Sequence, residues 1–174
     1  MTIIGLTGSL ASGKTTASKI IANNKGQLFS ADRVVKKLYN QKKFKRILSK
    51  KLNFGNDKNF KKNLKNKILK KKEILGKLEK IIHPLVRKEM FIFLKKNVKK
   101  NFLFLEISLL IESKLAKYFD VIIFIKSNKN LRLKRFMLRG GSPNLFSVLD
   151  NHQIKDSKKM KFCDHIVVNN KSLS

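Results

Sequence analysis

The chain has 174 residues, of which 42% are hydrophobic, so it is long enough to form one compact domain with a sizeable core. Its formal net charge of +30 reflects 41 lysine and arginine residues against 11 acidic residues. Either a polyanion-binding surface or the codon usage of an AT-rich coding sequence gives such a charge, and we favour codon usage because the lysines are spread along the whole chain.

Length, cysteine count and hydropathy exclude several protein classes. The single cysteine, Cys163, excludes an internal disulfide, and no window approaches the ~20 apolar residues of a membrane span. The chain starts directly with an apolar run, without the features of a signal peptide. We therefore expect a cytoplasmic protein, a monomer or small homo-oligomer, with neither a membrane nor a specific nucleic acid as partner.

The first forty residues alternate between short apolar runs and amphipathic segments. Apolar runs of this kind are typical of buried parallel strands, and apolar positions at helical spacing favour helices between them. In chain order, the sequence predicts a strand at 2–7, a helix at 14–24, a strand at 27–30 and a helix at 32–40.

Residues 42–100 form a long lysine-rich block with helical periodicity, which is broken near Asn53–Asn59 and marked by His83-Pro84. Proline there should end or kink a helix, and the residues by themselves favour a helix boundary. The block is too long for a simple crossover between strands. We expect it to form an inserted helical subdomain that binds the substrate.

Strands and helices alternate again in the last third of the chain. The pattern predicts strands at 102–107 and 120–125, a helix at 128–139, a Gly-Gly-Ser-Pro turn, a helix to about 153, and a strand at 165–169. The whole order predicts an α/β fold in three layers, in which a parallel five-stranded sheet is flanked by helices on both faces.

Residues 8–15, GSLASGKT, match the Gly-x-x-x-x-Gly-Lys-Thr pattern of a phosphate-binding P-loop between a predicted strand and a predicted helix. Gly8 and Gly13 allow successive backbone N–H groups to face an anion, and Lys14 adds a point charge on the β- and γ-phosphate oxygens. The Thr15 hydroxyl is a hard oxygen ligand suited to Mg²⁺. Ala11, Ser12 and Thr16 complete the predicted phosphate-binding segment.

Asp32 follows the second predicted strand, at the edge of the sheet where ligands bind in open α/β folds. A carboxylate there could accept a proton from an attacking hydroxyl or hold Mg²⁺. It could equally be the N-cap of the helix that follows, and position alone does not decide between the two roles.

Arg135 and Arg139 lie four residues apart on one face of the predicted 128–139 helix, in a chain that otherwise uses lysine. Guanidinium groups suit the distributed charge of a transferring phosphoryl group, which favours function over a solvated helix face. Cys163, Asp164 and His165 are adjacent in sequence and lack the spacing of metal ligands.

Several segments together resemble the dephospho-CoA kinase family, from residue 3 to about 170. The segment GLTGSLASGKTT resembles the family's GLTGGIGSGKST, and FSADRVVKKL resembles its D-A-D-x-I/V segment. LEKIIHPLVRKEM resembles L-E-x-I-x-H-P-x-V-R, and LEISLLIES resembles D-x-P-L-L-F-E-S. LRLKRFMLRGG resembles the lid helix, while HQ at 152–153 and CDHIVVNN resemble the closing A-Q and A-D-x-V-I-x-N-N elements.

The resemblance implies a P-loop fold like that of the nucleoside monophosphate kinases, with a lid at residues 128–153. It implies transfer of the γ-phosphate of ATP to the ribose 3′-hydroxyl of dephospho-CoA, the last step of coenzyme A synthesis, with ATP and Mg²⁺ required. Asp32 would be the catalytic base, assisted by Lys14, Arg135 and Arg139, and Asn169 would lie near the adenine of ATP. The implied substrate residues are His83, Pro84, Arg87, Leu109, Leu110 and Glu112, together with Asp32.

The chain departs from the family pattern at several positions. Ser30 replaces the first acid of D-A-D, Glu106 replaces an Asp, and Ser108 replaces the following Pro. Ser9 replaces a loop Gly, and Leu149 stands where the family usually has Arg. These changes bear on catalytic efficiency more than on the reaction.

Two other functions are open at this stage. One is another P-loop kinase for a small molecule, such as a nucleoside, a nucleotide or a shikimate-like acid, although the HP and SLLIES segments argue against it. The other is a basic nucleic-acid-binding protein with a regulatory P-loop, which would require a clustered basic face or base-stacking aromatic side chains.

Overall fold

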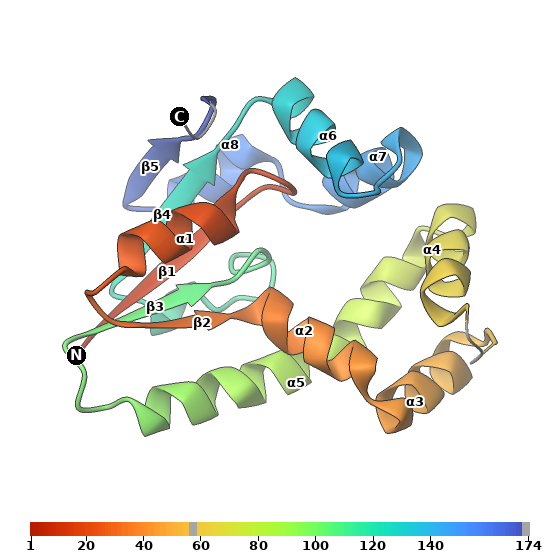
Figure 1. Ribbon diagram of the computed structural model, residues 1–174, viewed down its shortest axis with the longest axis horizontal. Coiled ribbons are helices and arrows are strands. Elements are labelled where there is room, and N and C mark those ends of the chain that lie inside the picture. The colour runs from red at the N-terminus through yellow and green to blue at the C-terminus, as the bar shows by residue number, and fades with distance from the viewer. Residues whose placement is uncertain (56–58, 172–174) are drawn as a thin grey trace.

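The computed structural model describes residues 1–55 and 59–171, and its centre is a five-stranded, fully parallel sheet (Figure 1). The strand order is β2-β3-β1-β4-β5. Each strand lies within one residue of its predicted bounds. The strands are β1 (Thr2–Gly8), β2 (Gln27–Ser30), β3 (Phe102–Glu106), β4 (Val121–Lys126) and β5 (His165–Val168).

Helices pack on both faces of the sheet because side chains of successive strand residues point to opposite faces. On one face, α1 (Lys14–Ala22) places Ala22 against Leu6 and Phe104. On the other face, Leu103 and Leu105 join the larger core that includes α5 (Glu73–Lys96). The predicted α/β fold, a parallel five-stranded sheet flanked by helices, is therefore confirmed.

The block predicted as helical at 42–100 contains three helices beside α2 (Ala31–Asn40). They are α3 (Lys42–Leu52), α4 (Phe60–Lys70) and α5, and part of the predicted break at 53–59 lies outside the described residues. Their apolar side chains belong to the same core cluster as the inner face of the sheet. The helical block is thus packed onto the sheet through one continuous core, and its treatment as a separate substrate subdomain stays a prediction.

Pro84 lies inside α5, so the interpretation of His83-Pro84 as a helix boundary is wrong. Proline removes one backbone hydrogen bond and crowds the preceding turn, which bends a helix without always ending it. Figure 1 shows the first half of α5 running at an angle to its second half. The side chains that pack α5 into the core lie on both sides of Pro84 and hold the two halves together, namely Ile74, Leu75, Leu78, Ile82, Val86 and Met90.

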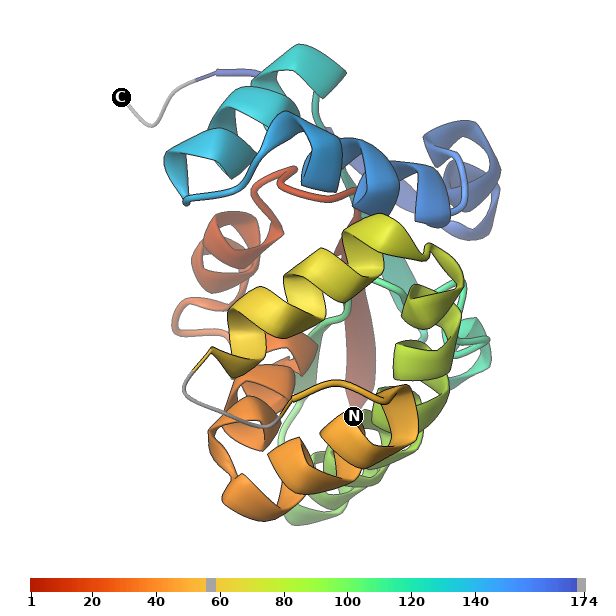
Figure 2. The ribbon, with the colours of Figure 1, turned by 90° about the vertical axis from the view of Figure 1, so that its right-hand side faces the viewer.

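The segment predicted as a lid contains α6 (Lys129–Leu138) and α7 (Pro143–His152). Figure 2 shows both helices lying over the loop that follows β1, with α7 next to α4. The short helix α8 (Asp156–Lys159) follows and leads into β5. No helix in the described part of the chain is long and apolar enough to cross a membrane.

Candidate active site

A cavity of about 650 Å³ lies at the carboxyl ends of the parallel strands. The loop after β1, the start of α2, one side of α5 and the segment after β3 form its walls, and residues of the segment predicted as a lid cover it. Ligands of open α/β sheets bind at this edge because connections that leave the strands there diverge. The fold thus brings segments far apart in the sequence to one place.

The loop at residues 8–13 has the backbone geometry of an anion nest. Gly8 and Gly13 have φ values of 146° and 90°, and Ala11 has a φ of 57°. A Cβ atom at Gly13 would lie 2.2 Å from Nδ2 of Asn169, so the loop has no room for a larger residue there. The buried hydroxyl of Ser12 has no hydrogen-bond partner within the described chain, which fits a loop shaped for a phosphate.

Lys14 is buried under this loop. Its Nζ atom donates to the backbone oxygens of Gly8, at 3.0 Å, and Ser9, at 2.7 Å. Burial lowers the pKa of Lys14 from 10.5 to about 8, although Asp32 nearby opposes that shift. The ammonium group lies where a bound phosphate would stabilise its charge.

Thr15 and Glu106 form a pair of oxygen groups suited to a divalent cation. The Thr15 hydroxyl donates to Oε1 of Glu106 at 2.5 Å. Oε2 of Glu106 is buried with no hydrogen-bond partner among the described residues, and the residue is only 1% exposed. A buried carboxylate oxygen left unpaired is costly, so the residues present fit Mg²⁺ bound together with phosphate oxygens.

Asp32 lines the same cavity as Lys14 and Thr15. The N-cap of α2 is Ser30, whose hydroxyl accepts from the N–H of Arg33, so the interpretation of Asp32 as the N-cap is wrong. The Ser108 hydroxyl donates a hydrogen bond to Oδ2 of Asp32 at 3.5 Å. Burial by the cavity walls raises the pKa of Asp32 above 3.8, and Lys14 counteracts part of this effect. The residue is exposed and its carboxylate lies at the cavity, where a general base can reach a bound hydroxyl.

The two predicted arginines have different surroundings. Arg135 donates to the backbone oxygen of Ser12 at 3.4 Å and to that of Asn169 at 3.2 Å. It therefore contacts the backbone of the phosphate loop. Arg139 is exposed and lines the cavity. Asn169, predicted near adenine, donates to the oxygen of Ser12 at 2.9 Å.

Arg132 lies one helical turn before Arg135 and was not predicted as a site residue. It donates to the oxygen of Leu10 at 3.2 Å and forms an ion pair with Asp150 at 2.5 Å, and it is 5% exposed. Its spacing of three residues from Arg135 places both on one face of α6, which was the available signal. Arg132 joins the lid helices α6 and α7 to the phosphate loop.

Some of the residues expected to bind the acceptor line the cavity or a groove beside it, and others do not. His83, Arg87 and Leu109 line the cavity, and burial lowers the pKa of His83. Pro84 lines a neighbouring groove with His83 and Arg87.

Leu110 is completely buried, and the carboxylate of Glu112 is directed to Lys159 at 2.6 Å. Neither is among the residues that line the cavity, although Oε2 of Glu112 is buried without a hydrogen-bond partner in the described part of the chain. Their contact with substrate stays a prediction.

The cavity is also lined by residues that were not identified as site residues from the sequence, among them Val35, Tyr39, Lys65 and Glu79. Lys65 belongs to α4, and nothing in its sequence surroundings distinguishes it from the neighbouring lysines. Burial raises the pKa of Tyr39 to about 12, so its hydroxyl stays protonated at neutral pH. The side of the cavity formed by α2, α4 and α5 therefore combines an apolar wall with the cations of Lys65 and Arg87.

A phosphate loop that ends in Lys14 and Thr15, and a carboxylate across a covered cavity, define the class of P-loop phosphotransferases. Comparisons with known proteins narrow this class. The family model described as dephospho-CoA kinase matches residues 2–174. The dephospho-CoA kinase of Bartonella henselae is 33% identical over 99% of this chain and 91% of its own length. That of Fusobacterium nucleatum is 33% identical over 98% of this chain and 91% of its own length.

Solved structures agree with the sequence comparisons. The dephospho-CoA kinase of Campylobacter jejuni has a TM-score of 0.60 and 30% identity, and the match covers 98% of this chain and 89% of that one. A shikimate kinase from Acinetobacter baumannii has a TM-score of 0.57, with 99% and 86% covered, but its 15% identity shows a common fold alone. The chain belongs to the dephospho-CoA kinase family, which confirms the resemblance and disfavours the other functions considered above.

Proposed function

We propose that the chain transfers the γ-phosphate of ATP to the ribose 3′-hydroxyl of dephospho-CoA, giving coenzyme A and ADP. The observation that carries this proposal is the position of Asp32, in one cavity with Lys14 of the phosphate loop and with His83 and Arg87 of α5. Membership of the dephospho-CoA kinase family specifies the acceptor.

In the proposed reaction, the hydroxyl oxygen attacks the γ-phosphorus, the bond to the leaving ADP oxygen breaks, and Asp32 takes the hydroxyl proton. Lys14 and Arg139 stabilise charge on the transferring group, and Arg135 holds the loop carbonyls of Ser12 in place. Closure of residues 128–153 excludes water, so that the acceptor hydroxyl reacts in its place.

Thr15 and Glu106 would hold Mg²⁺ in this scheme, through the threonine hydroxyl and the unpaired carboxylate oxygen. When bound, the ion would neutralise charge on the β- and γ-phosphate oxygens. Gly8, Ala11, Ser12, Gly13 and Thr16 would contact the phosphates through the loop and the start of α1.

Lys65 and Arg87 are suited to the anionic diphosphate of dephospho-CoA, while Val35, Leu75 and Leu78 form an apolar surface for its less polar part. We place His83, Leu109 and Tyr39 on the same acceptor side. A cytoplasmic location and a monomeric or small oligomeric state are also part of the proposal, to be tested by fractionation and light scattering.

The decisive experiment incubates the purified protein with ATP and Mg²⁺ and one acceptor at a time from dephospho-CoA, adenosine, shikimate and DNA. Mass spectrometry should find a product heavier by one phosphate with dephospho-CoA and with no other acceptor. Asp32→Asn serves as the matched control, because it removes the base and nearly preserves side-chain size. Phosphorylation of another acceptor in preference to dephospho-CoA would exclude the proposed substrate.

A further inference from the structure

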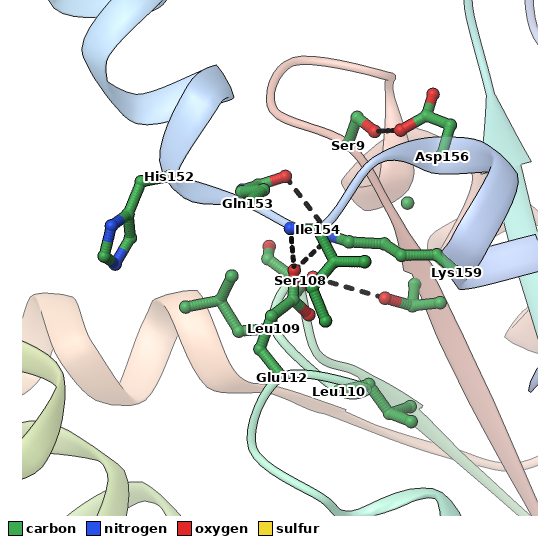
Figure 3. Close-up of polar contacts among 12 residues, drawn as sticks. Ser9, Ser108, Leu109, Leu110, Glu112, His152, Gln153, Ile154, Asp156 and Lys159 are labelled. Carbon is green, nitrogen blue, oxygen red and sulfur yellow. Dashed lines mark hydrogen bonds and ion pairs between the residues drawn. The ribbon is translucent and has the colours of Figure 1, made fainter. Parts of the chain in front are cut away.

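The short helix α8, with Ser9 and Glu112, forms a set of polar contacts between the phosphate loop and the end of the lid; we call it the brace (Figure 3). At the first residue of α8, the carboxylate of Asp156 accepts a hydrogen bond from the Ser9 hydroxyl. At its last residue, Lys159 forms an ion pair with Glu112 at 2.6 Å. Glu112 belongs to the turn that follows β3, so α8 connects the phosphate loop to that turn.

Both charges of the ion pair are removed from solvent. The side chain of Lys159 is 0% exposed and that of Glu112 is 13% exposed. Burial of two charges costs more than burial of an apolar pair unless geometry and further hydrogen bonds compensate, so a buried ion pair is weak evidence for a contribution to stability. Both groups also make hydrogen bonds to the chain near the end of α7.

The two groups hold the residues at which the chain leaves the lid helix α7. Nζ of Lys159 donates to Oε1 of Gln153 at 3.3 Å, and Oε1 of Glu112 accepts from the backbone N–H of Ile154 at 3.2 Å. Gln153 also lines the cavity. The C-terminal end of the lid is thus fixed by one buried ion pair.

The other end of the brace fixes the phosphate loop. Ser9 is 3% exposed, and its backbone oxygen accepts from Nζ of Lys14 at 2.7 Å. Ser9 therefore contacts Asp156 through its side chain and the phosphate-binding Lys14 through its backbone oxygen. A glycine at this position would have no side chain with which to make that link.

We propose that the brace couples closure of the lid to the conformation of the phosphate loop, and that Ser9, Glu112, Asp156 and Lys159 are positioning residues for phosphoryl transfer. The inference rests on the proposed function for the role of the lid in excluding water. It gives Glu112 a role in the hinge of the lid in place of the substrate contact predicted for it.

The first test replaces the buried ion pair with apolar side chains of similar size, Glu112→Leu with Lys159→Met, so that neither charge is left unpaired. Hydrogen exchange of the variant, without nucleotide, should show exchange at the Ile154 amide that is about tenfold faster than in the wild type. The ratio of ADP formed to coenzyme A formed should rise about fivefold, because an unfixed lid admits water. Lys161→Met, at an exposed lysine two residues further on, is the matched control.

The second test is a double-mutant cycle of Ser9→Ala and Asp156→Ala, which leaves the ion pair intact. If the two residues act through their hydrogen bond, each single variant raises KM for ATP by about threefold and the double variant raises it no further.

Unchanged Ile154 exchange in a folded Glu112→Leu/Lys159→Met variant, or independent effects of Ser9→Ala and Asp156→Ala, would overturn the brace. If the wild type does not phosphorylate dephospho-CoA, the proposed function fails, while the exchange measurement still decides whether the brace exists.

Discussion

The buried ammonium group of Lys14 should make the stability of the protein depend on pH in a way that one substitution removes. Burial lowers the pKa of Lys14 from 10.5 to about 8, and the side chain is only 6% exposed. Because the folded state binds this proton less tightly than the unfolded state, the group destabilises the fold below its folded pKa. Stability should therefore increase as the pH rises from about 8 toward 10.5.

The magnitude follows from the two pKa values of Lys14. Near pH 7, the cost of holding the charge in the folded state is about 3 kcal/mol, at ~1.4 kcal/mol per pKa unit. Near pH 9.5 the folded protein carries a largely neutral amine, and the cost falls to about 1 kcal/mol. Between these conditions the Lys14 contribution should thus change by about 2 kcal/mol.

Urea denaturation of the wild type and of Lys14→Met at both pH values measures this change. The substitution also leaves the oxygens of Gly8 and Ser9 without their lysine partner, but that cost does not vary with pH and cancels in the comparison. We expect the variant's stability relative to wild type to fall by about 2 kcal/mol between pH 7 and 9.5. The folded variant should also lose phosphoryl transfer.

Lys161→Met is the matched control for the loss of one lysine, because Lys161 is exposed in the same chain. A stability difference between Lys14→Met and wild type that stays constant to within about 0.5 kcal/mol would refute the reasoning. Either the amine would then be solvated in the folded state or its charge would be fully compensated by Asp32.

Asp32→Asn should lower kcat by about 10²-fold or more, with little change in Tm. Coupled ADP release measures kcat and thermal unfolding measures Tm. A near-normal kcat would contradict the role of Asp32 as the base. Ser108→Ala should move the rising limb of the pH–rate profile to higher pH, because the Ser108 hydrogen bond lowers the pKa of Asp32, and a shift to lower pH would contradict this. Arg132→Met should destabilise the protein by about 3 kcal/mol by leaving Asp150 unpaired, and Arg132→Met/Asp150→Leu should restore most of that stability in urea titrations. If the double variant is as unstable as the single one, Arg132 stabilises by some other means.

The strands and the phosphate loop could be predicted from the sequence because local patterns determine them. Apolar runs such as residues 102–106 can be buried only in a covered sheet, and the P-loop requires fixed glycines next to Lys14. By contrast, the kink at Pro84 and the N-cap at Ser30 depend on what the neighbouring helices contact. The same residues are compatible with a helix end or with an acid cap, and tertiary packing decides between them.

Which of the many basic residues contribute to the site was much harder to predict. Lys65 and Lys159 look like other basic residues in a chain with 41 of them, and only the packing of α4 and α8 distinguishes them. Glu112 illustrates the limit most clearly. Resemblance to the family predicted that it contacts substrate, yet its carboxylate is directed to Lys159. A motif specifies that a residue is constrained, but the fold determines whether that constraint comes from the ligand or from the residues that hold the site in place.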